Sequence, residues 1–293
     1  MNMFNEGMIE DFRNYLLLER NSSLNTVDGY IRDLEQFDNF LKGKDFREVE
    51  NNDVSMFVRE LSSKGLKPQT TNRKLSSIKS FYLFLRRNGH VNVSPAEVIQ
   101  GAKQEMKLPQ PIDIEDINDI FDAIPEEDLR AKVIFEILYG TGARRFEVAK
   151  IRVRDINFKR KYIKILGKGN KERLVPINEH ALVLIQKLIN QNENKEWLFP
   201  STQNEGKCIS IRLVSLIVKT YVNKAGLEDF NITPHKFRHS FCSHLYAGGA
   251  DLKTIQTFAG HASSNTTNGY TKISNERSFN EYSKAHPRAN MQA

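Results

Sequence analysis

The chain has 293 residues, of which 39% are hydrophobic and 27% charged, so it is long enough for two globular domains and is neither disordered nor fibrous in composition. No apolar run reaches the roughly 20 residues that a membrane helix needs, the N-terminus lacks a signal-peptide pattern, and two cysteines cannot build a disulfide framework. We therefore expect a cytoplasmic protein without membrane contact, whose net charge of +7 favours a polyanionic partner.

Residues 1–101 are predicted to form a first domain of four or five helices. Apolar residues recur at the helical spacing of three and four in stripes that include Val27, Ile31, Leu34 and Phe37, and then Leu75, Ile78, Tyr82 and Leu85. Residues 64–87 also carry basic side chains and no acidic one. We expect this basic segment on an exposed face, where it either contacts nucleic acid or is simply solvated.

Residues 102–112 form the predicted linker, because Pro109 and Pro111 prevent a continuous helix. Residues 113–293 form the predicted second domain, in which helical patterns surround three short strands at 156–158, 162–166 and 173–177. A second basic segment, residues 152–173, covers these strands and their turns. The fold class is therefore mainly α with a small antiparallel β-sheet in the second domain.

Two polar motifs flank the predicted strands. Arg144 lies at a loop-to-helix junction, and Glu147 follows three positions later on the same helical face, as an ordinary surface ion pair also would. Lys168 lies in the turn of the sequence GKGNKER, where glycines let the backbone approach a ligand closely. A solvated hairpin tip is the alternative. The motif is not a P-loop, and no dinucleotide fingerprint is complete.

Two further motifs lie near the C-terminus. His235 and Arg238 are three positions apart at a proline-initiated helix. His239 gives His235 a zinc-like partner, but Lys236 stands where a metalloprotease needs glutamate, so we predict no metal site. His261 and then Tyr270, nine positions later, lie in a segment too polar for a core. Together with Arg144 and Lys168, these groups can attack a phosphodiester without a metal ion.

These motifs resemble those of the tyrosine recombinases and integrases, in the order and at the spacings of the Xer type (XerC, XerD and the archaeal XerA-like enzymes), along essentially the whole chain. One departure is Phe258-Ala259 before Gly260-His261, where Xer proteins usually show two leucines. The resemblance implies a helical core-binding domain of the SAM-like type and a catalytic domain that close around DNA as a two-domain, C-shaped clamp.

The resemblance also implies a role for each polar group. Tyr270 is the nucleophile that forms a 3′-phosphotyrosyl link, and Arg144 and Arg238 stabilise the charge on the phosphate oxygens. Lys168 is the general acid for the departing 5′ oxygen, and His235 is the best candidate to accept the tyrosine proton.

His261 is expected to donate a further hydrogen bond to the phosphate, although the two histidine roles are open to exchange. Glu147 orients the arginine site. No cofactor is expected. Contacts to DNA are assigned to basic residues of the first domain and of the hairpin: Arg73, Lys74, Lys79, Arg86, Lys171 and Arg173.

The expected partner is double-stranded DNA with inverted half-sites, bound by a homo-oligomer that forms a tetramer on paired sites or by this chain with a paralogous recombinase. An amphipathic C-terminal helix with Ile273, Phe279 and Tyr282 docks on a neighbouring protomer in such a family, or else packs on its own domain. The expected function is resolution of chromosome dimers at a dif-like site. A phage or mobile-element integrase and a non-catalytic DNA-binding regulator are the alternatives.

Overall fold

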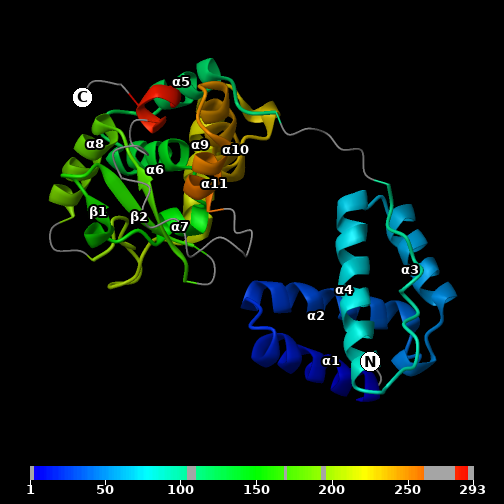
Figure 1. Cartoon of the computed structure of the whole chain (residues 1–293). Coiled ribbons are helices and arrows are strands. Elements are labelled where there is room, and N and C mark those ends of the chain that lie inside the picture. Colours follow the sequence, from blue (N-terminus) through cyan, green and yellow to red (C-terminus); the bar gives the residue numbers. More distant parts are fainter. Residues whose placement is uncertain (1–2, 104–109, 168–169, 193–195, 261–280, 290–293) are drawn as a thin grey trace. The chain divides into compact units, whose positions relative to one another are not determined.

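The structure is a computed structural model that describes residues 3–103, 110–167, 170–192, 196–260 and 281–289. The chain divides into two compact units, Met1–Lys107 and Leu108–Ala293, and each has its own apolar core. Figure 1 shows the first unit in blue to cyan and the second from green to red. Within the described ranges, no helix is both long and apolar enough to cross a membrane.

The described part of the first unit is helical. Its elements are α1 (Met3–Asn14), the π turn η1 (Tyr15–Glu19), α2 (Leu24–Leu41), the 3-10 turn η2 (Phe46–Glu48), α3 (Asn51–Ser63) and α4 (Pro68–Arg87). Ser23 caps α2 with its side chain, and Pro68 opens α4 at the first helical position. The predicted stripes of α2 and α4 are buried against the rings of Phe12, Phe37 and Phe81, which confirms the helical prediction.

Residues 104–109 of the predicted linker lie outside the described residues. The chain before them and the chain after them are each hydrogen-bonded to one polar side chain. In the first unit, Asn72 Nδ2 donates to the carbonyl oxygen of Ala102 at 2.9 Å, and the N–H of Ala102 donates to Asn72 Oδ1 at 2.8 Å. In the second unit, the N–H of the buried Ile112 donates to Ser240 Oγ at 2.8 Å. Ala102 is thus fixed to the first unit and Ile112 to the second.

A three-stranded antiparallel sheet lies among the helices of the second unit (Figure 1). Its strands are β1 (Ile156–Asn157), β2 (Tyr162–Leu166) and β3 (Glu172–Pro176), with Ile165 opposite Arg173. The helical elements are α5 (Ile114–Asp122), α6 (Leu129–Thr141), α7 (Arg145–Ala149), η3 (Val153–Asp155), α8 (Glu179–Gln191), α9 (Ile211–Lys224), η4 (Glu228–Phe230), α10 (Pro234–Ala247) and α11 (Leu252–Ala259). This confirms the predicted fold class.

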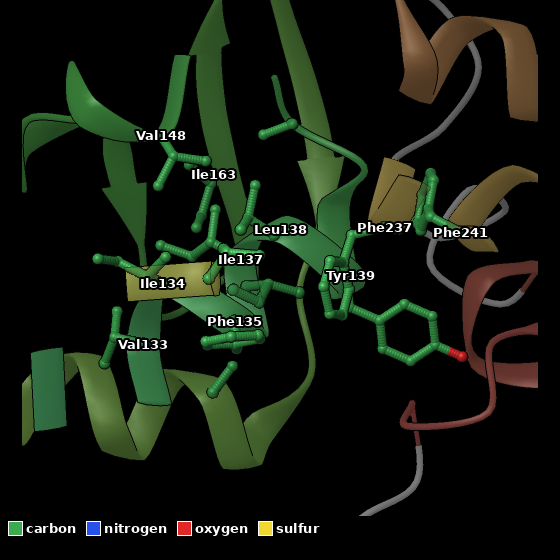
Figure 2. Packing of buried hydrophobic residues seen from close by; sticks show 14 of the residues in the cluster. Val133, Ile134, Phe135, Ile137, Leu138, Tyr139, Val148, Ile163, Phe237 and Phe241 are labelled. Atoms are coloured by element: carbon green, nitrogen blue, oxygen red, sulfur yellow. The ribbon is translucent and has the colours of Figure 1, made fainter. Parts of the chain in front are cut away.

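Helix α6 lies at the centre of the second core. Figure 2 shows its buried side chains, Val133, Ile134, Phe135, Ile137, Leu138 and Tyr139, and the rings of Phe237 and Phe241 from α10. Ten of its thirteen residues are buried, so other elements have to enclose it, and α6 contacts α7, α8, α9 and α10. The turn at its C-terminal end, where the first arginine motif begins, is therefore fixed in position.

The C-terminal residues 281–289 pack on the second unit of their own chain. Tyr282 is 1% exposed, and Arg288 forms a buried ion pair with Glu136 of α6. A Cβ atom at Gly248 would lie only 2.7 Å from Ala285 Cα, so no larger residue fits where α10 meets this segment. These contacts bury Tyr282, Ala285, His286 and Arg288.

This packing bears on the predicted C-terminal helix. Ile273 and Phe279 lie outside the described residues, whereas Tyr282 points into its own unit. In the single chain, the described segment therefore adopts the second of the two arrangements that the sequence left open.

His286 is buried in this segment as a neutral imidazole. Its Nε2 lies 3.1 Å from the carbonyl oxygen of Tyr139 and donates to it, while its Nδ1 accepts from the N–H of Arg288 at 3.3 Å. A second proton, on Nδ1, would point at the N–H of Arg288 and take away its acceptor, which disfavours the charged imidazole. Burial is the main cause that lowers the pKa of His286, to about 3.

Acid is therefore expected to destabilise the second unit through His286. In the unfolded state His286 binds a proton near pH 6.5, whereas in the folded state it does so only near pH 3. The contribution of His286 to the stability of the second unit is therefore complete above about pH 6.5 and is lost as pH falls towards 3. The expected slope between these values is up to about 1.4 kcal/mol per pH unit. Urea unfolding followed by fluorescence of Trp197, the chain's single tryptophan, measures it.

His286→Gln is the matched variant, because a glutamine amide can still donate to Tyr139 but does not titrate. Its free energy of unfolding should depend less on pH than that of the unchanged protein. Two parallel pH curves would show that His286 is not the group responsible.

Candidate active site

The site begins where α6 ends. Gly142 has a left-handed backbone (φ +60°), and a Cβ atom there would lie 2.9 Å from Phe241 Cε1 and closer still to Cδ1. Only glycine meets both demands. The turn leads through the fully buried Ala143 to Arg144, the N-cap residue of α7.

Glu147 is the buried acceptor at the centre of the site, and its side chain is fully buried. It accepts hydrogen bonds from Arg144 through the backbone N–H (2.8 Å) and Nη1 (3.0 Å), and from Arg173 through Nη1 (3.1 Å) and Nη2 (2.7 Å). Burial raises its pKa, but the hydrogen bonds and charges of the two arginines outweigh it, so the pKa lies below its usual range. Glu147 is therefore an anion that holds two guanidinium groups.

Arg173 points inward from β3, and its side chain is only 8% exposed. Besides the two bonds to Glu147, its Nε donates to the carbonyl oxygen of Phe258 at 2.7 Å. This placement differs from the expected DNA contact, because three nitrogens of the guanidinium already have partners inside the unit.

Arg238 enters the same cluster from α10 and is 3% exposed. Its Nη1 donates to the carbonyl oxygen of Gly142 at 2.7 Å, and its Nη2 donates to that of Ala259. Burial, followed by the charges of Arg144 and Arg173, lowers its pKa to about 10. Arg238 is thus desolvated and held by two neutral oxygens.

The cluster carries more positive than negative charge. Three guanidinium groups, those of Arg144, Arg173 and Arg238, surround the single carboxylate of Glu147, so the sum of their formal charges is +2. Guanidinium is planar, always charged and suited to grip two oxygens at once. An oxyanion with a charge of one or two, such as a phosphodiester, would complete the site.

Four further residues are predicted to belong to the site. His235 is exposed in the first turn of α10, one turn before Arg238. Lys168, His261 and Tyr270 lie outside the described residues. The structure therefore brings together Arg144, Glu147 and Arg238.

The described neighbours of Lys168 and His261 nevertheless lie beside the cluster. A Cβ atom at Gly167 would be 3.6 Å from Glu147 Oε1, and one at Gly260 would be 3.1 Å from Arg173 Cδ. The chain thus passes the arginines immediately before Lys168 and immediately before His261.

The basic residues assigned to DNA contact on α4 differ in their surroundings. Arg73 and Lys74 both pair with the buried Asp33 of α2, and Lys74 is the less exposed of the two, at 12% against 51%. Arg86 is exposed and pairs with Glu97 at 3.3 Å. Lys74 therefore neutralises a buried carboxylate, whereas Arg73 and Arg86 keep exposed surface.

Two of the assigned basic residues form no ion pair with any described residue. Lys79 is half-buried on α4, and Lys171 is exposed at the base of the hairpin, where its carbonyl accepts the N–H of Gly167 at 2.8 Å. Of the two hairpin residues assigned to DNA contact, Lys171 and not Arg173 is therefore free to reach a ligand.

Comparison with known proteins gives two family matches. Residues 110–277 match the Phage integrase family, and residues 9–89 match the family described as Phage integrase, N-terminal SAM-like domain. A curated relative, Tyrosine recombinase XerC of Pelobacter propionicus, is 37% identical over 289 residues, which cover 96% of this chain and 95% of the relative.

Solved structures with the same fold include two protein–DNA complexes. The integrase of the Tn1549 transposon, in complex with transposon right end DNA, has a TM-score of 0.72 at 19% identity and covers 94% of each chain. The XerH site-specific recombinase, bound to palindromic difH substrate, has a TM-score of 0.71 at 21% identity over 92% of this chain and 79% of that one.

Gly142→Ala is expected to destabilise the second unit by about 2–4 kcal/mol, because it adds a collision with Phe241 to the strain of a left-handed alanine. Gly226→Ala is the matched control: its φ is +72°, but nothing lies within 4 Å of the added Cβ atom. Urea unfolding followed by Trp197 fluorescence compares the two. Equal losses of stability would contradict the inferred collision.

Proposed function

Because the chain belongs to the phage integrase family, and within it to the tyrosine recombinases of the Xer type, we propose that Tyr270 cleaves DNA at a specific site by covalent attack. The enzyme is a site-specific DNA recombinase. The observation that carries the proposal is the cluster of Arg144 and Arg238 near Glu147, in which Arg238 forms no ion pair with any described residue, so that an oxyanion would complete the cluster.

The chemistry is a phosphoryl transfer in which the number of phosphoester bonds is conserved. The phenolic oxygen of Tyr270 forms a bond to phosphorus while the bond from phosphorus to the 5′ oxygen breaks. His235 accepts the tyrosine proton, and Lys168 protonates the departing oxygen. A 5′-hydroxyl from another strand then reverses these steps, so no nucleotide is consumed.

The arginines stabilise the charge that develops on the phosphate oxygens. Arg238 uses two terminal nitrogens for carbonyl oxygens, and a guanidinium has five N–H groups, so it retains donors for a phosphate. Arg144 is about one-third exposed, and its Nη2 donates to no described residue. His261 donates to the same oxygens in this scheme.

The two units divide the work. In this proposal residues 1–101 act as the core-binding domain and residues 113–293 as the catalytic domain, and both bind the same duplex DNA. Exposed basic residues support this division, namely Arg73 and Arg86 in the first unit and Lys171 in the second.

The Xer relatives favour a chromosomal role. In this role the enzyme acts at a dif-like site with inverted half-sites, as a tetramer of this chain or together with a paralogue. An integrase of a mobile element would use the same chemistry. Cleavage of element ends but not of the host's dif-like site would identify that alternative.

Residues 281–289 supply a contact between protomers in this proposal. The surface that receives Tyr282 and Arg288 in one chain is identical in the next, so the segment can fill the neighbour's surface in place of its own. Such an exchange would link active sites within a tetramer.

Tyr270→Phe is expected to abolish the covalent adduct with a nicked suicide substrate, because phenylalanine has no oxygen to attack phosphorus. The adduct is measured as a shifted band on a denaturing gel, in the presence of EDTA. Tyr246→Phe is the matched control, since Tyr246 is an exposed tyrosine of α10 and should leave the adduct unchanged. An adduct in Tyr270→Phe would remove Tyr270 from its role.

Arg144→Lys is expected to lower the single-turnover cleavage rate by about a hundredfold to a thousandfold, because lysine keeps the charge but cannot hold Glu147 and a phosphate together. Arg145→Lys is the control: Arg145 is exposed and donates Nη1 to Ser215 Oγ at 3.1 Å. Rates are compared at saturating enzyme. Similar rates for both variants would contradict the assignment of Arg144.

A further inference from the structure

Arg173 is an arginine on the buried side of a strand. In β3 the side chains of Glu172 and Leu174 are exposed, whereas Arg173 and Val175 point inward. A guanidinium in such a place needs partners for its donors. The structure provides them through Glu147 and the carbonyl oxygen of Phe258.

The first of these partners connects Arg173 to Arg144. Glu147 receives four hydrogen bonds, two from each arginine. Removal of Arg173 would leave a fully buried carboxylate with Arg144 as its remaining donor. Arg144 would then be drawn further towards Glu147 and away from the position that it holds in the intact cluster.

The second partner connects Arg173 to the end of α11. The carbonyl oxygens of Phe258 and Ala259 are consecutive, and they accept from Arg173 Nε and Arg238 Nη2 respectively. Cationic groups are favourable at a helix C-terminus. Gly260, which follows in a left-handed conformation (φ +61°), packs on the aliphatic part of Arg173. Arg173 thus sets the direction in which the chain leaves α11 for His261.

The same guanidinium also lies at the base of the hairpin. A Cβ atom at Gly167 would be 3.7 Å from Arg173 Nη1, and the N–H of Gly167 closes the hairpin on the carbonyl of Lys171 at 2.8 Å. Lys168 is the next residue. The side chain of Arg173 therefore lies beside Gly167 and Gly260, the residues before Lys168 and His261, and is linked to Arg144 through Glu147.

We propose that Arg173 is a positioning residue that fixes Arg144 through Glu147 and fixes the starting points of the segments that carry Lys168 and His261. This inference rests on the proposed function, because it concerns the roles given there to these three groups. Arg173 does not supply charge to the phosphate, since Glu147 neutralises it and all three nitrogens of its guanidinium donate inside the unit, whereas Arg238 donates to two neutral carbonyl oxygens.

The test is the cleavage rate of Arg173→Gln at saturating enzyme, on a nicked duplex that carries the dif-like site. We expect the rate to fall about a hundredfold, as a displacement of about 1 Å in catalytic groups can cause. The affinity for the same duplex and its salt dependence should be unchanged. A residue that contacts phosphate would instead weaken binding and reduce the salt slope by about one. Weakened binding with a normal rate would overturn the proposal.

The pH profile of cleavage separates positioning from a general loss of structure. The charged groups that face Glu147 are Arg144, Arg173 and, more distantly, Arg238. Without Arg173, burial would raise the pKa of Glu147, so the rate of Arg173→Gln should fall further towards acid pH than that of the unchanged enzyme. In the double variant with Glu147→Gln this extra dependence should disappear, and persistence there would contradict coupling through Glu147.

Arg212→Gln is the matched control, because it removes an exposed guanidinium from α9 and should cleave at the normal rate. If Arg173→Gln shows no cooperative unfolding by Trp197 fluorescence, Arg173→Lys replaces it. Lysine keeps the charge but cannot bridge Glu147 and Phe258, so a rate reduced about tenfold is expected, and a normal rate would overturn the proposal. A Tyr270-dependent adduct at normal rate in the Arg173 variants refutes this inference alone, whereas an adduct in Tyr270→Phe refutes the proposed function.

Discussion

The buried carboxylate of Glu147 holds Arg144 and Arg173 of the second unit in place. Glu147 also completes the N-terminal cap of the five-residue helix α7 by accepting the N–H of Arg144, so the start of this short helix and the position of the guanidinium depend on one interaction. Breaking a buried ion pair by removing one partner costs about 3–5 kcal/mol. The carboxylate is therefore needed both for the local fold and for the shape of the site.

The geometry of the carboxylate depends in turn on the apolar core. Helix α6 is enclosed on all sides and ends at Gly142, which Phe241 of α10 limits to glycine. The same α10 carries Arg238, whose guanidinium binds the carbonyl of Gly142 at 2.7 Å. Packing of the core thus brings Arg144 and Arg238, which are almost a hundred positions apart in the sequence, into one cluster.

Much of this arrangement could be predicted from the sequence, because it depends on local periodicity and short spacings. The stripes of α2 and α4, the three short strands and the pairing of Arg144 with Glu147 are all local patterns. The inward position of Arg173 is not of this kind, because a count of basic residues treats each one as solvated. Alternation along β3 carries the missing signal: Val175 is buried, so Arg173, two positions earlier, faces the same side.

Other features depend on partners far away in the sequence. Lys74 appeared to be a surface cation, yet it neutralises Asp33 across 41 positions. In the C-terminal segment, the buried Arg288 pairs with Glu136, which lies 152 positions away in the sequence. No local pattern contains such pairings, and only the tertiary fold provides them.

The surroundings of Arg238 have a consequence for the thermal behaviour of the enzyme. Within the described residues its desolvated guanidinium donates to two neutral peptide carbonyls, so an anionic ligand bound beside it would relieve part of the cost of its burial. By mass action, a ligand present at a hundred times its dissociation constant stabilises the folded state by about 2.7 kcal/mol. We therefore expect an anionic ligand bound at this cluster to raise the temperature at which the second unit unfolds.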